Sequence, residues 1–251
     1  FVSFFDFFNI FVPSVVTYII PAVIRSLFIS NKIPEGDGKK VEILPGGQVI
    51  AALGIFTIIF TVSGHQILHM PPVFGMMFGL GALGTYGYFL KTKYPKNNKF
   101  DIFVQTGRAE WDTLLFFYGI LVSVGGLAAL GYLSLISNDM YGTLGPTYAN
   151  ILVGFLSAII DNIPIVYAVL TAHPEMDMGQ WLLITLTAGV GGSLLSIGSA
   201  AGVALMGQAR GVYTFFSHLK WSWAILLVYA AGVVVHLWMN ADLFDNIPLA
   251  K

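Results

Sequence analysis

The sequence predicts an all-α polytopic membrane protein with about six transmembrane helices, a re-entrant helical hairpin and a broken helix. Composition supports this class, because the 251 residues are 56% hydrophobic and 10% charged and their mean hydropathy is +0.78. A soluble domain carries about 25% charged residues, so this chain cannot cover a surface that faces water. A third observation is local. Asp161, Asn162 and Pro164 stand at the centre of an otherwise apolar run, and an ionisable residue within a membrane segment is a candidate functional residue.

Composition also argues against several function classes. The chain has no cysteine, so it has no disulfide, thiolate nucleophile or Cys-ligated metal. Its basic residues lie in short loops beside apolar spans, where membrane orientation explains them. We therefore expect the lipid bilayer as a partner, no nucleic acid and no cofactor. The chain starts at Phe1 inside an apolar run without the basic start of a signal peptide, and we expect it to begin partway through a longer protein.

Three spans are predicted in the first part of the chain. They cover residues 7–29, 48–68 and 73–90, and a polar, glycine-rich loop at 30–45 separates the first two. The third span contains glycines at spacings that let helices approach closely in lipid, so we interpret them as packing positions. They are Gly75, Gly79, Gly81, Gly84 and Gly87.

A basic loop at 91–110 follows. Its segment 100–108 has the mixture of apolar and polar residues that suits a short helix lying on the membrane interface. The remaining apolar stretches are the predicted spans 112–136, 181–206 and 221–239 and the unusual run 149–172.

The charges of the loops bear on how the run 149–172 sits in the membrane. The positive-inside rule places loops 30–45 and 91–110 in the cytoplasm. If 149–172 crossed once, the basic loop 207–220 would lie outside; if it dips in and returns, that loop is cytoplasmic. With the hairpin, all of the twelve basic residues except Lys251 are cytoplasmic, and the carboxy terminus lies outside.

We place the turn of this hairpin at residues 161–164, because proline frees a backbone carbonyl and stops a regular helix. The polar loop 137–148, which has no Lys or Arg, would precede it. The alternative is a single Pro-kinked helix in which Asp161 is neutral and hydrogen-bonded.

The span 181–206 is the second unusual segment. Residues 189–202 include five glycines and three serines, and each glycine weakens a helix interior by about 1 kcal/mol relative to alanine. One interpretation is an unwound helix whose carbonyls and hydroxyls coordinate a cation. The alternative is a face of small residues for tight helix packing. A hairpin turn opposite a broken helix is typical of a cation site in a transporter.

Two motifs resemble the NhaD-type sodium/proton antiporters: SAIIDNIP at 157–164 and GGSLLSIGSAAGVALMG at 191–207. The segment AEWDTLLFFYG at 109–119 is also similar, and the likeness extends over most of the chain from about Gly46 onward. The resemblance implies membership of the ion transporter superfamily. In that fold two inverted repeats each hold a hairpin and a broken helix, and a scaffold forms a homodimer.

Each motif occurs once in this chain, so the resemblance implies the carboxy-terminal half of an inverted-repeat transporter fold, with about 150–200 further residues upstream. Residues 1–45 would then be a scaffold helix and a cytoplasmic loop, and 46–110 scaffold helices and an interfacial segment. Residues 111–251 would be the transport region, with hairpin 149–172 and broken helix 181–206.

The activity that the resemblance implies is exchange of Na⁺, or Li⁺, for H⁺ across the inner membrane by alternating access, without an enzymatic reaction. It implies that Asp161 binds the cation when ionised and the proton when neutral. Asp112 matches a family acid and would relay protons, with N-capping of a helix as its alternative role. The resemblance assigns the following residues to the Na⁺ site: Ser157, Asp161, Asn162, Ser196 and Ser199.

Other function classes remain as alternatives. A sister carrier for dicarboxylates or arsenite would share the fold, although Asp161 argues against an anionic substrate. A non-transporting membrane subunit would not need a polar hairpin facing a broken helix. An intramembrane enzyme would need a nucleophile–base pair or a multi-histidine metal site. His65 and His69, four residues apart, make a metal site or a pH sensor only a minor alternative. The other three histidines, His173, His218 and His236, are expected to be structural.

Overall fold

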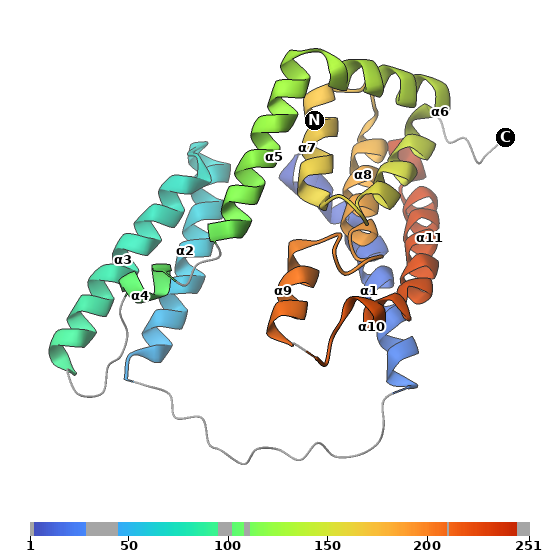
Figure 1. The fold of residues 1–251 in the computed structure, drawn as a ribbon. Helices are drawn as coiled ribbons and strands as arrows, with labels where there is room; N and C mark the ends of the chain where they lie inside the picture. The colour runs from blue at the N-terminus through green and yellow to red at the C-terminus, as the bar shows by residue number, and fades with distance from the viewer. Residues whose placement is uncertain (1–2, 29–44, 95–101, 108–110, 210, 245–251) are drawn as a thin grey trace. The chain divides into compact units, whose positions relative to one another are not determined.

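The computed structural model describes residues 3–28, 45–94, 102–107, 111–209 and 211–244, and in these ranges the chain is helical with no strand (Figure 1). The chain divides into two compact units. Unit 1 comprises residues 1–31 and 113–251, and unit 2 comprises residues 32–112.

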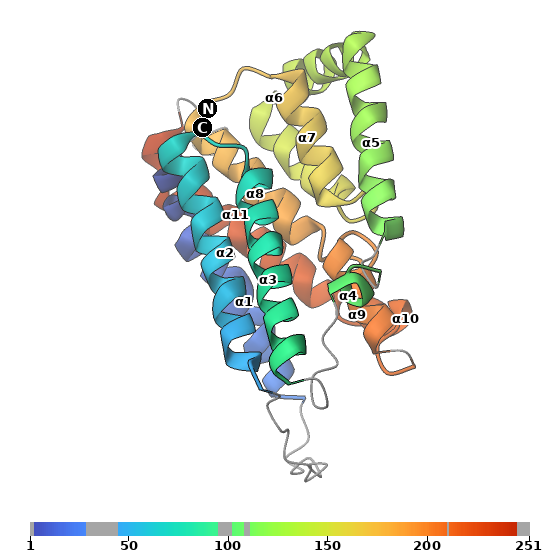
Figure 2. The same ribbon diagram turned by 90° about the vertical axis from the view of Figure 1, so that its left-hand side faces the viewer.

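Unit 2 is built on two antiparallel helices, α2 (Gly47–Leu68) and α3 (Pro72–Lys93), which lie side by side in Figure 2. Gly75 lies against Thr61 and Gly79 against Thr57, so closely that an added Cβ would overlap either threonine. The packing interpretation is confirmed for these two glycines. The short helix predicted at 100–108 is present as α4 (Ile102–Gly107). The loop 30–45 lies almost wholly outside the described residues, as does part of 91–110.

In unit 1, α1 (Phe11–Ser26) follows the short helix η1 (Phe4–Ile10) and packs antiparallel to α11 (Ser222–Met239). The pair is tied at both ends. At one end the Asn240 side chain donates to the Asn9 carbonyl at 3.0 Å, and at the other the Arg25 guanidinium lies 5.0 Å from the centre of the Trp221 ring.

The predicted number of spans needs correction. Among the described residues, four helices are long and apolar enough to cross a membrane (4–26, 47–68, 72–93 and 222–239), or five if one bent pair is counted as a span. This agrees with a polytopic membrane protein, with fewer regular spans than the six predicted. Of the six predicted spans, 181–206 is interrupted as predicted, and 112–136 belongs to the bent pair.

The predicted span 112–136 and loop 137–148 are wrong in detail. Helix α5 (Trp111–Ala129) ends at a bend of 79°, where Gly131 adopts a φ of 81°, and α6 (Tyr132–Leu156) then continues through the predicted loop. A second interruption falls at Gly145, whose φ is 75°, directly before Pro146. A residue before proline is disfavoured in the α-helical region, which locates this interruption.

Four further helices complete unit 1: α7 (Asn162–Ala172), α8 (Met178–Gly191), α9 (Ala200–Gln208) and α10 (Phe215–Leu219). Helix α8 is the centre of this unit, since it contacts α6, α7 and α11 and most of its residues are buried. Two apolar clusters hold it, one built around Val153, Val169 and Ile184 and the other around Leu183, Tyr229 and Val233.

Candidate ion-binding site

The arms of the helix–turn–helix formed by α6 and α7 run beside α8. The Asn150 side chain donates to the Gln180 carbonyl at 3.0 Å near the start of α8, and Ser157 Oγ donates to the Ala188 carbonyl at 2.9 Å near its end. The second segment of α6 is therefore parallel to α8, and α7 returns in the opposite direction (Figure 1). At 1.5 Å per residue, the turn lies about 15–20 Å along α8 from its start.

The turn itself begins earlier in the sequence than we predicted. Helix α6 ends at Leu156, and α7 begins at Asn162 with Asp161 as its N-cap, whose carboxylate accepts the N–H of Ile163 at 3.0 Å. Pro164 lies in the first turn of α7, where the missing N–H has no helical partner to lose. The alternative of one Pro-kinked helix is therefore wrong.

The interruption predicted within 181–206 is present. Helix α8 ends at Gly191, residues 192–199 are not helical, and α9 begins at Ala200. Ser199 caps α9, because its hydroxyl accepts the N–H of Gly202 at 3.1 Å. We call residues 192–199 the break.

The turn and the break are in direct contact through glycines. A Cβ added at Gly191 would overlap the Gly154 carbonyl, and one at Gly198 would stand 2.6 Å from the Ala158 carbonyl. A Cβ at Gly192 would lie 3.5 Å from the Asn162 Cβ. The interruption of the helix and the tight packing of small residues thus occur together, because the glycines both break the helix and allow backbone to meet backbone.

Two of the predicted site serines are buried at this contact. Ser157 is 0% exposed, and its single hydroxyl proton has two acceptors, the carbonyls of Gly154 at 2.7 Å and Ala188 at 2.9 Å. Ser196 is 2% exposed, and its hydroxyl contacts the Met206 sulfur at 3.4 Å. A hydroxyl that donates still has lone pairs, so both oxygens can also act as ligands.

Asp161 supplies the charge of this region. It is half-buried, and among the described residues no basic side chain forms an ion pair with it. The carboxyl ends of α6 and α8 carry partial negative charge and lie at the same level. Hard cations prefer such oxygen atoms, from carboxylate, hydroxyl and carbonyl groups. The arrangement can therefore bind a monovalent or divalent hard cation.

Some of the predicted residues belong to unit 2. Asp112 belongs to α5 but falls within unit 2, and its side chain is outside the described set. His65 contacts the Met70 carbonyl at 3.1 Å, and His69 ends α2 with a φ of 53°. In the described ranges no three His, Asp or Glu residues are grouped as a metal site would require.

Two residues that contact the break were missed. His218 Nε2 lies 2.9 Å from the Ser193 carbonyl, and the Ser222 hydroxyl donates to the Leu194 carbonyl at 2.6 Å. His218 had been interpreted as structural. No sequence signal marks these contacts, because the partner in each is a backbone carbonyl.

Comparisons with known proteins identify the family of the chain. The family model described as "Citrate transporter" matches residues 2–189. The chain is 52% identical over 95% of its length to the "Na(+)/H(+) antiporter NhaD" of Alkalimonas amylolytica and 47% identical over 97% to that of Halomonas elongata, covering 54% of each. It is 35% identical over 91% of its length to "Sodium/proton antiporter 1" of Arabidopsis thaliana, covering 41% of that protein.

No solved structure matches the chain. The chain spans about half the length of the curated bacterial relatives it matches. A family match over most of the chain, together with identities near 50% to several NhaD proteins, confirms the resemblance drawn from the motifs. The chain belongs to the membrane carrier family of the citrate-transporter model, and within it to the group that contains the NhaD antiporters.

Proposed function

We propose that the protein is a secondary transporter that exchanges Na⁺, or Li⁺, for H⁺ by alternating access, without a cofactor. The observation that carries this proposal is the contact between the turn at residues 157–161 and the break at 192–199. Asp161 ends this turn, forms no ion pair with a described basic residue, and belongs to the same segment as the buried Ser157 hydroxyl. The names of the three relatives described above, each a sodium/proton antiporter, support the same substrates.

In this proposal Ser157, Asp161, Asn162, Ser196 and Ser199 provide the oxygen ligands of the cation. Asp161 accepts either the cation or a proton, and the two compete because each neutralises the same charge. Exchange follows if the occupied forms change their exposure between the two sides and the empty, charged form does not.

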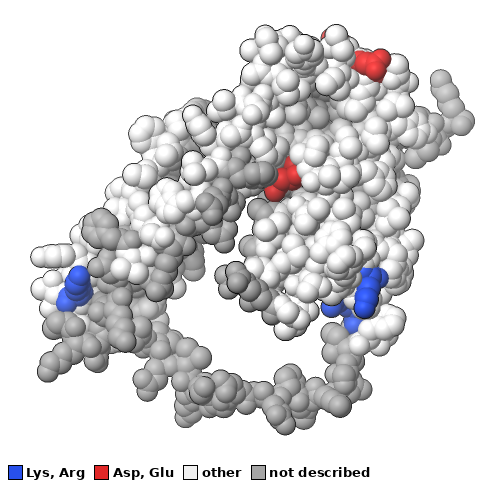
Figure 3. Space-filling view, viewed as in Figure 1, with Lys and Arg blue, Asp and Glu red and all other residues white. Residues whose placement is uncertain are grey.

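The distribution of charge in unit 1 supports a re-entrant hairpin. The contacts between helices define an acidic end, with Asp6, Asp177 and Asp242, and a basic end, with Arg25 and Lys220. Figure 3 shows the blue side chains of this unit together near the ends of α1 and α10.

By the positive-inside rule the basic end is cytoplasmic. Both arms of the α6–α7 hairpin have their open ends at the acidic end, since Asn150 lies beside Gln180 and α7 leads to Asp177. The hairpin therefore enters and leaves from the outer side, and the carboxy terminus follows Asp242 on that side.

Three further expectations belong to this proposal: an inverted repeat of the same design elsewhere in the protein, a homodimer formed through the scaffold, and the inner membrane as its location. A carrier of citrate or another carboxylate, which the name of the family model suggests, would place an anion against Asp161. The charge of Asp161 therefore favours a cation.

The decisive experiment is Asp161→Asn in the whole protein, assayed in proteoliposomes with a pH-sensitive dye. Asparagine also caps helices, so α7 should still form, but Na⁺- and Li⁺-driven proton flux should vanish. Asp177→Asn is the matched control, because Asp177 caps α8 in the same way, accepting from the Gln180 N–H at 2.8 Å. Flux near the wild-type rate in Asp161→Asn would show that the site has been assigned wrongly.

A further inference from the structure

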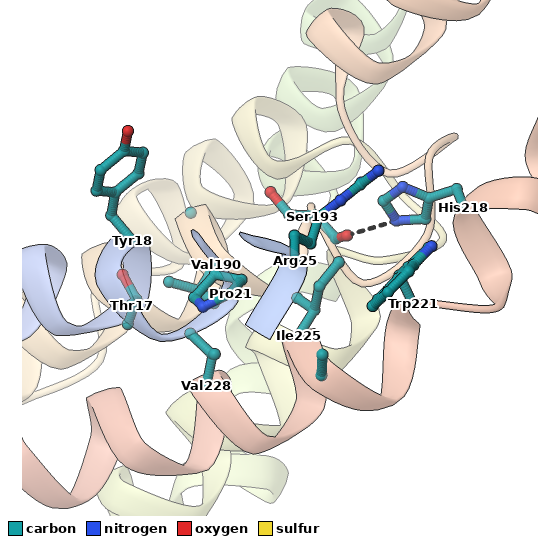
Figure 4. Close-up of a pocket in the computed structure, with 12 residues that line it drawn as sticks. Thr17, Tyr18, Pro21, Arg25, Val190, Ser193, His218, Trp221, Ile225 and Val228 are labelled. Atoms are coloured by element: carbon teal, nitrogen blue, oxygen red, sulfur yellow. Dashed lines mark hydrogen bonds between the residues drawn. The ribbon is translucent and has the colours of Figure 1, made fainter. Parts of the chain in front are cut away.

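The break also contacts side chains outside the hairpin turn. His218 on α10 reaches the Ser193 carbonyl, and Ser222 at the start of α11 reaches the next carbonyl, that of Leu194. Figure 4 shows the imidazole pointing at Ser193, with Arg25 and Trp221 beside it. Two consecutive peptide groups of the break are thus fixed by side chains from one short segment, residues 218–222.

The position of the protons in this contact follows from chemistry. A carbonyl oxygen only accepts, so His218 Nε2 must carry the hydrogen. In the neutral imidazole Nδ1 is then an acceptor, and it faces the hydroxyl of Tyr213 at 2.5 Å. Burial raises the pKa of Tyr213, and the nearby Arg25 charge opposes this shift. The phenol therefore stays protonated, and its O–H donates a hydrogen bond to Nδ1. The hydrogen bond from Tyr213 favours the tautomer in which Nε2 carries the hydrogen and donates to the break.

We infer that His218 and Ser222 are positioning residues of the transport site, which hold the break in the conformation that binds the cation. This inference rests on the proposed function. Neither residue contacts the proposed ligands directly. Both act on them through the backbone, since Ser196 and Ser199 lie two and five residues beyond Leu194 in the same non-helical segment.

The physical reason is preorganisation. Residues 192–199 lack the regular hydrogen bonds of a helix, and ordering each free residue costs about 1–2 kcal/mol of conformational entropy. A segment that is already fixed when the cation arrives loses less freedom on binding, so its affinity is higher. On the α1 side, a pocket of about 410 Å³ lined by Ser193, His218, Arg25 and Trp221 leaves room for the break to move once the two bonds are lost.

The test uses the whole protein, with His218→Ala, His218→Gln and Ser222→Ala. Two readouts are needed: the KM for Na⁺ and the maximal rate in proteoliposomes, and hydrogen–deuterium exchange of peptides covering residues 192–199. We expect His218→Ala and Ser222→Ala to raise KM about fivefold, the factor that corresponds to one lost hydrogen bond of about 1 kcal/mol. The maximal rate should change less, and exchange in the break should become faster.

His218→Gln should restore KM and protection, because the glutamine amide can still donate to the Ser193 carbonyl. Matched controls are His65→Ala, which removes a histidine–carbonyl contact in unit 2, and Ser123→Ala, which removes a hydroxyl bonded to Gly119 within α5. Neither control should change exchange in the break.

The outcomes separate this inference from the proposed function. If His218→Ala and Ser222→Ala change neither the KM for Na⁺ nor the hydrogen–deuterium exchange of the break, the inference is overturned. The proposal of Na⁺/H⁺ antiport would still stand. A wild-type protein that does not exchange Na⁺ for H⁺ would refute the proposed function. In that case hydrogen–deuterium exchange of residues 192–199 still tests whether His218 and Ser222 hold the break. Unchanged amide protection in the two alanine variants would refute this structural role as well.

Discussion

Helices α6 and α8 meet through polar groups at two levels, and the two contacts are built differently. At the upper level, near the start of α8, side chains bond to one another. Asn150 accepts from Tyr141 at 2.9 Å and donates to the Gln180 side chain at 3.1 Å, and Gln180 donates to Thr147 at 2.7 Å. At the lower level, Gly154, Ser157 and Gly191 bring backbone against backbone.

The difference shows what each contact is for. The upper network is buried and saturated, with each amide group paired, so it fixes the two helices and offers nothing to a ligand. The lower contact has carbonyls at helix ends, a shared hydroxyl proton and the half-buried Asp161. A cation that enters there gains oxygen ligands without breaking a complete network. The upper contact is therefore structural, and the lower one is suited to binding.

The largest effect is expected from Gly191→Ala, which tests the lower contact. The added methyl group would overlap the Gly154 carbonyl, which is backbone and cannot turn aside. Overpacking of this kind costs about 1–3 kcal/mol, and we expect transport to be lost together with a lower thermal midpoint in detergent. Gly189→Ala is the control, since no atom lies within 4 Å of its Cβ position. Normal transport by Gly191→Ala would mean that the close approach is not required.

The next effect concerns the upper network. Asn150→Ala removes the partners of Gln180 Oε1 and the Tyr141 hydroxyl, at a cost of about 1–3 kcal/mol in the free energy of unfolding. The KM for Na⁺ should stay near the wild-type value. Thermal unfolding of Asn150→Ala, Gln180→Ala and the double variant should show non-additive losses. A raised KM with unchanged stability would reverse the roles that we assign to the two levels.

Ser157→Ala tests whether the Ser157 hydroxyl contributes to stability alone or also to cation binding. The hydroxyl bonds two carbonyls within the protein, so its removal should lower stability by about 1 kcal/mol. If Ser157 is also a ligand, the KM for Na⁺ rises several-fold. Ser123→Ala, which removes an exposed hydroxyl bonded to Gly119, provides the baseline for losing one serine hydroxyl. Equal KM values for the two variants would limit Ser157 to packing.

The smallest effect is expected from Tyr213→Phe, which alters the pH dependence of the thermal midpoint. Tyr213 follows the break in the sequence and contacts His218. Burial raises the pKa of Tyr213 in the folded protein, so the folded state favours the neutral phenol. The corresponding stability is present below the unfolded pKa of about 10 and is lost as the pH rises through the folded value. The thermal midpoint of the wild type should therefore fall more between pH 9 and about pH 11.5 than that of Tyr213→Phe. Parallel curves would contradict this.

The hairpin and the break were predictable because their signals are local. Asp161 and Pro164 fall within four residues, and the glycines and serines of 189–202 lie in one segment, so composition alone marks both. The bend at Gly131 was missed because a glycine in an apolar run is compatible with a continuous helix. Glycine adopts a φ of 81° without steric cost, so its presence permits the bend but does not mark it in the sequence.

The contacts of the site were less predictable. Gly154 and Gly191 are far apart in the sequence, and neither residue type indicates its partner. The contact of His218 with the break was not predicted, because its partner is the peptide carbonyl of Ser193 and every residue has such a group. The resemblance to a family identified the residues with ligand chemistry, whereas the residues that position them emerge from packing.

The pairing of α1 with α11 has a practical consequence for testing the proposed transport cycle. Because the Asn240–Asn9 bond and the Arg25–Trp221 contact fasten the two helices at opposite ends, neither helix can slide or tilt against the other without breaking one of them. The pair therefore provides a fixed reference for distance measurements. A spectroscopic label on α7, measured against a second label on α11, would report the movement of the hairpin itself.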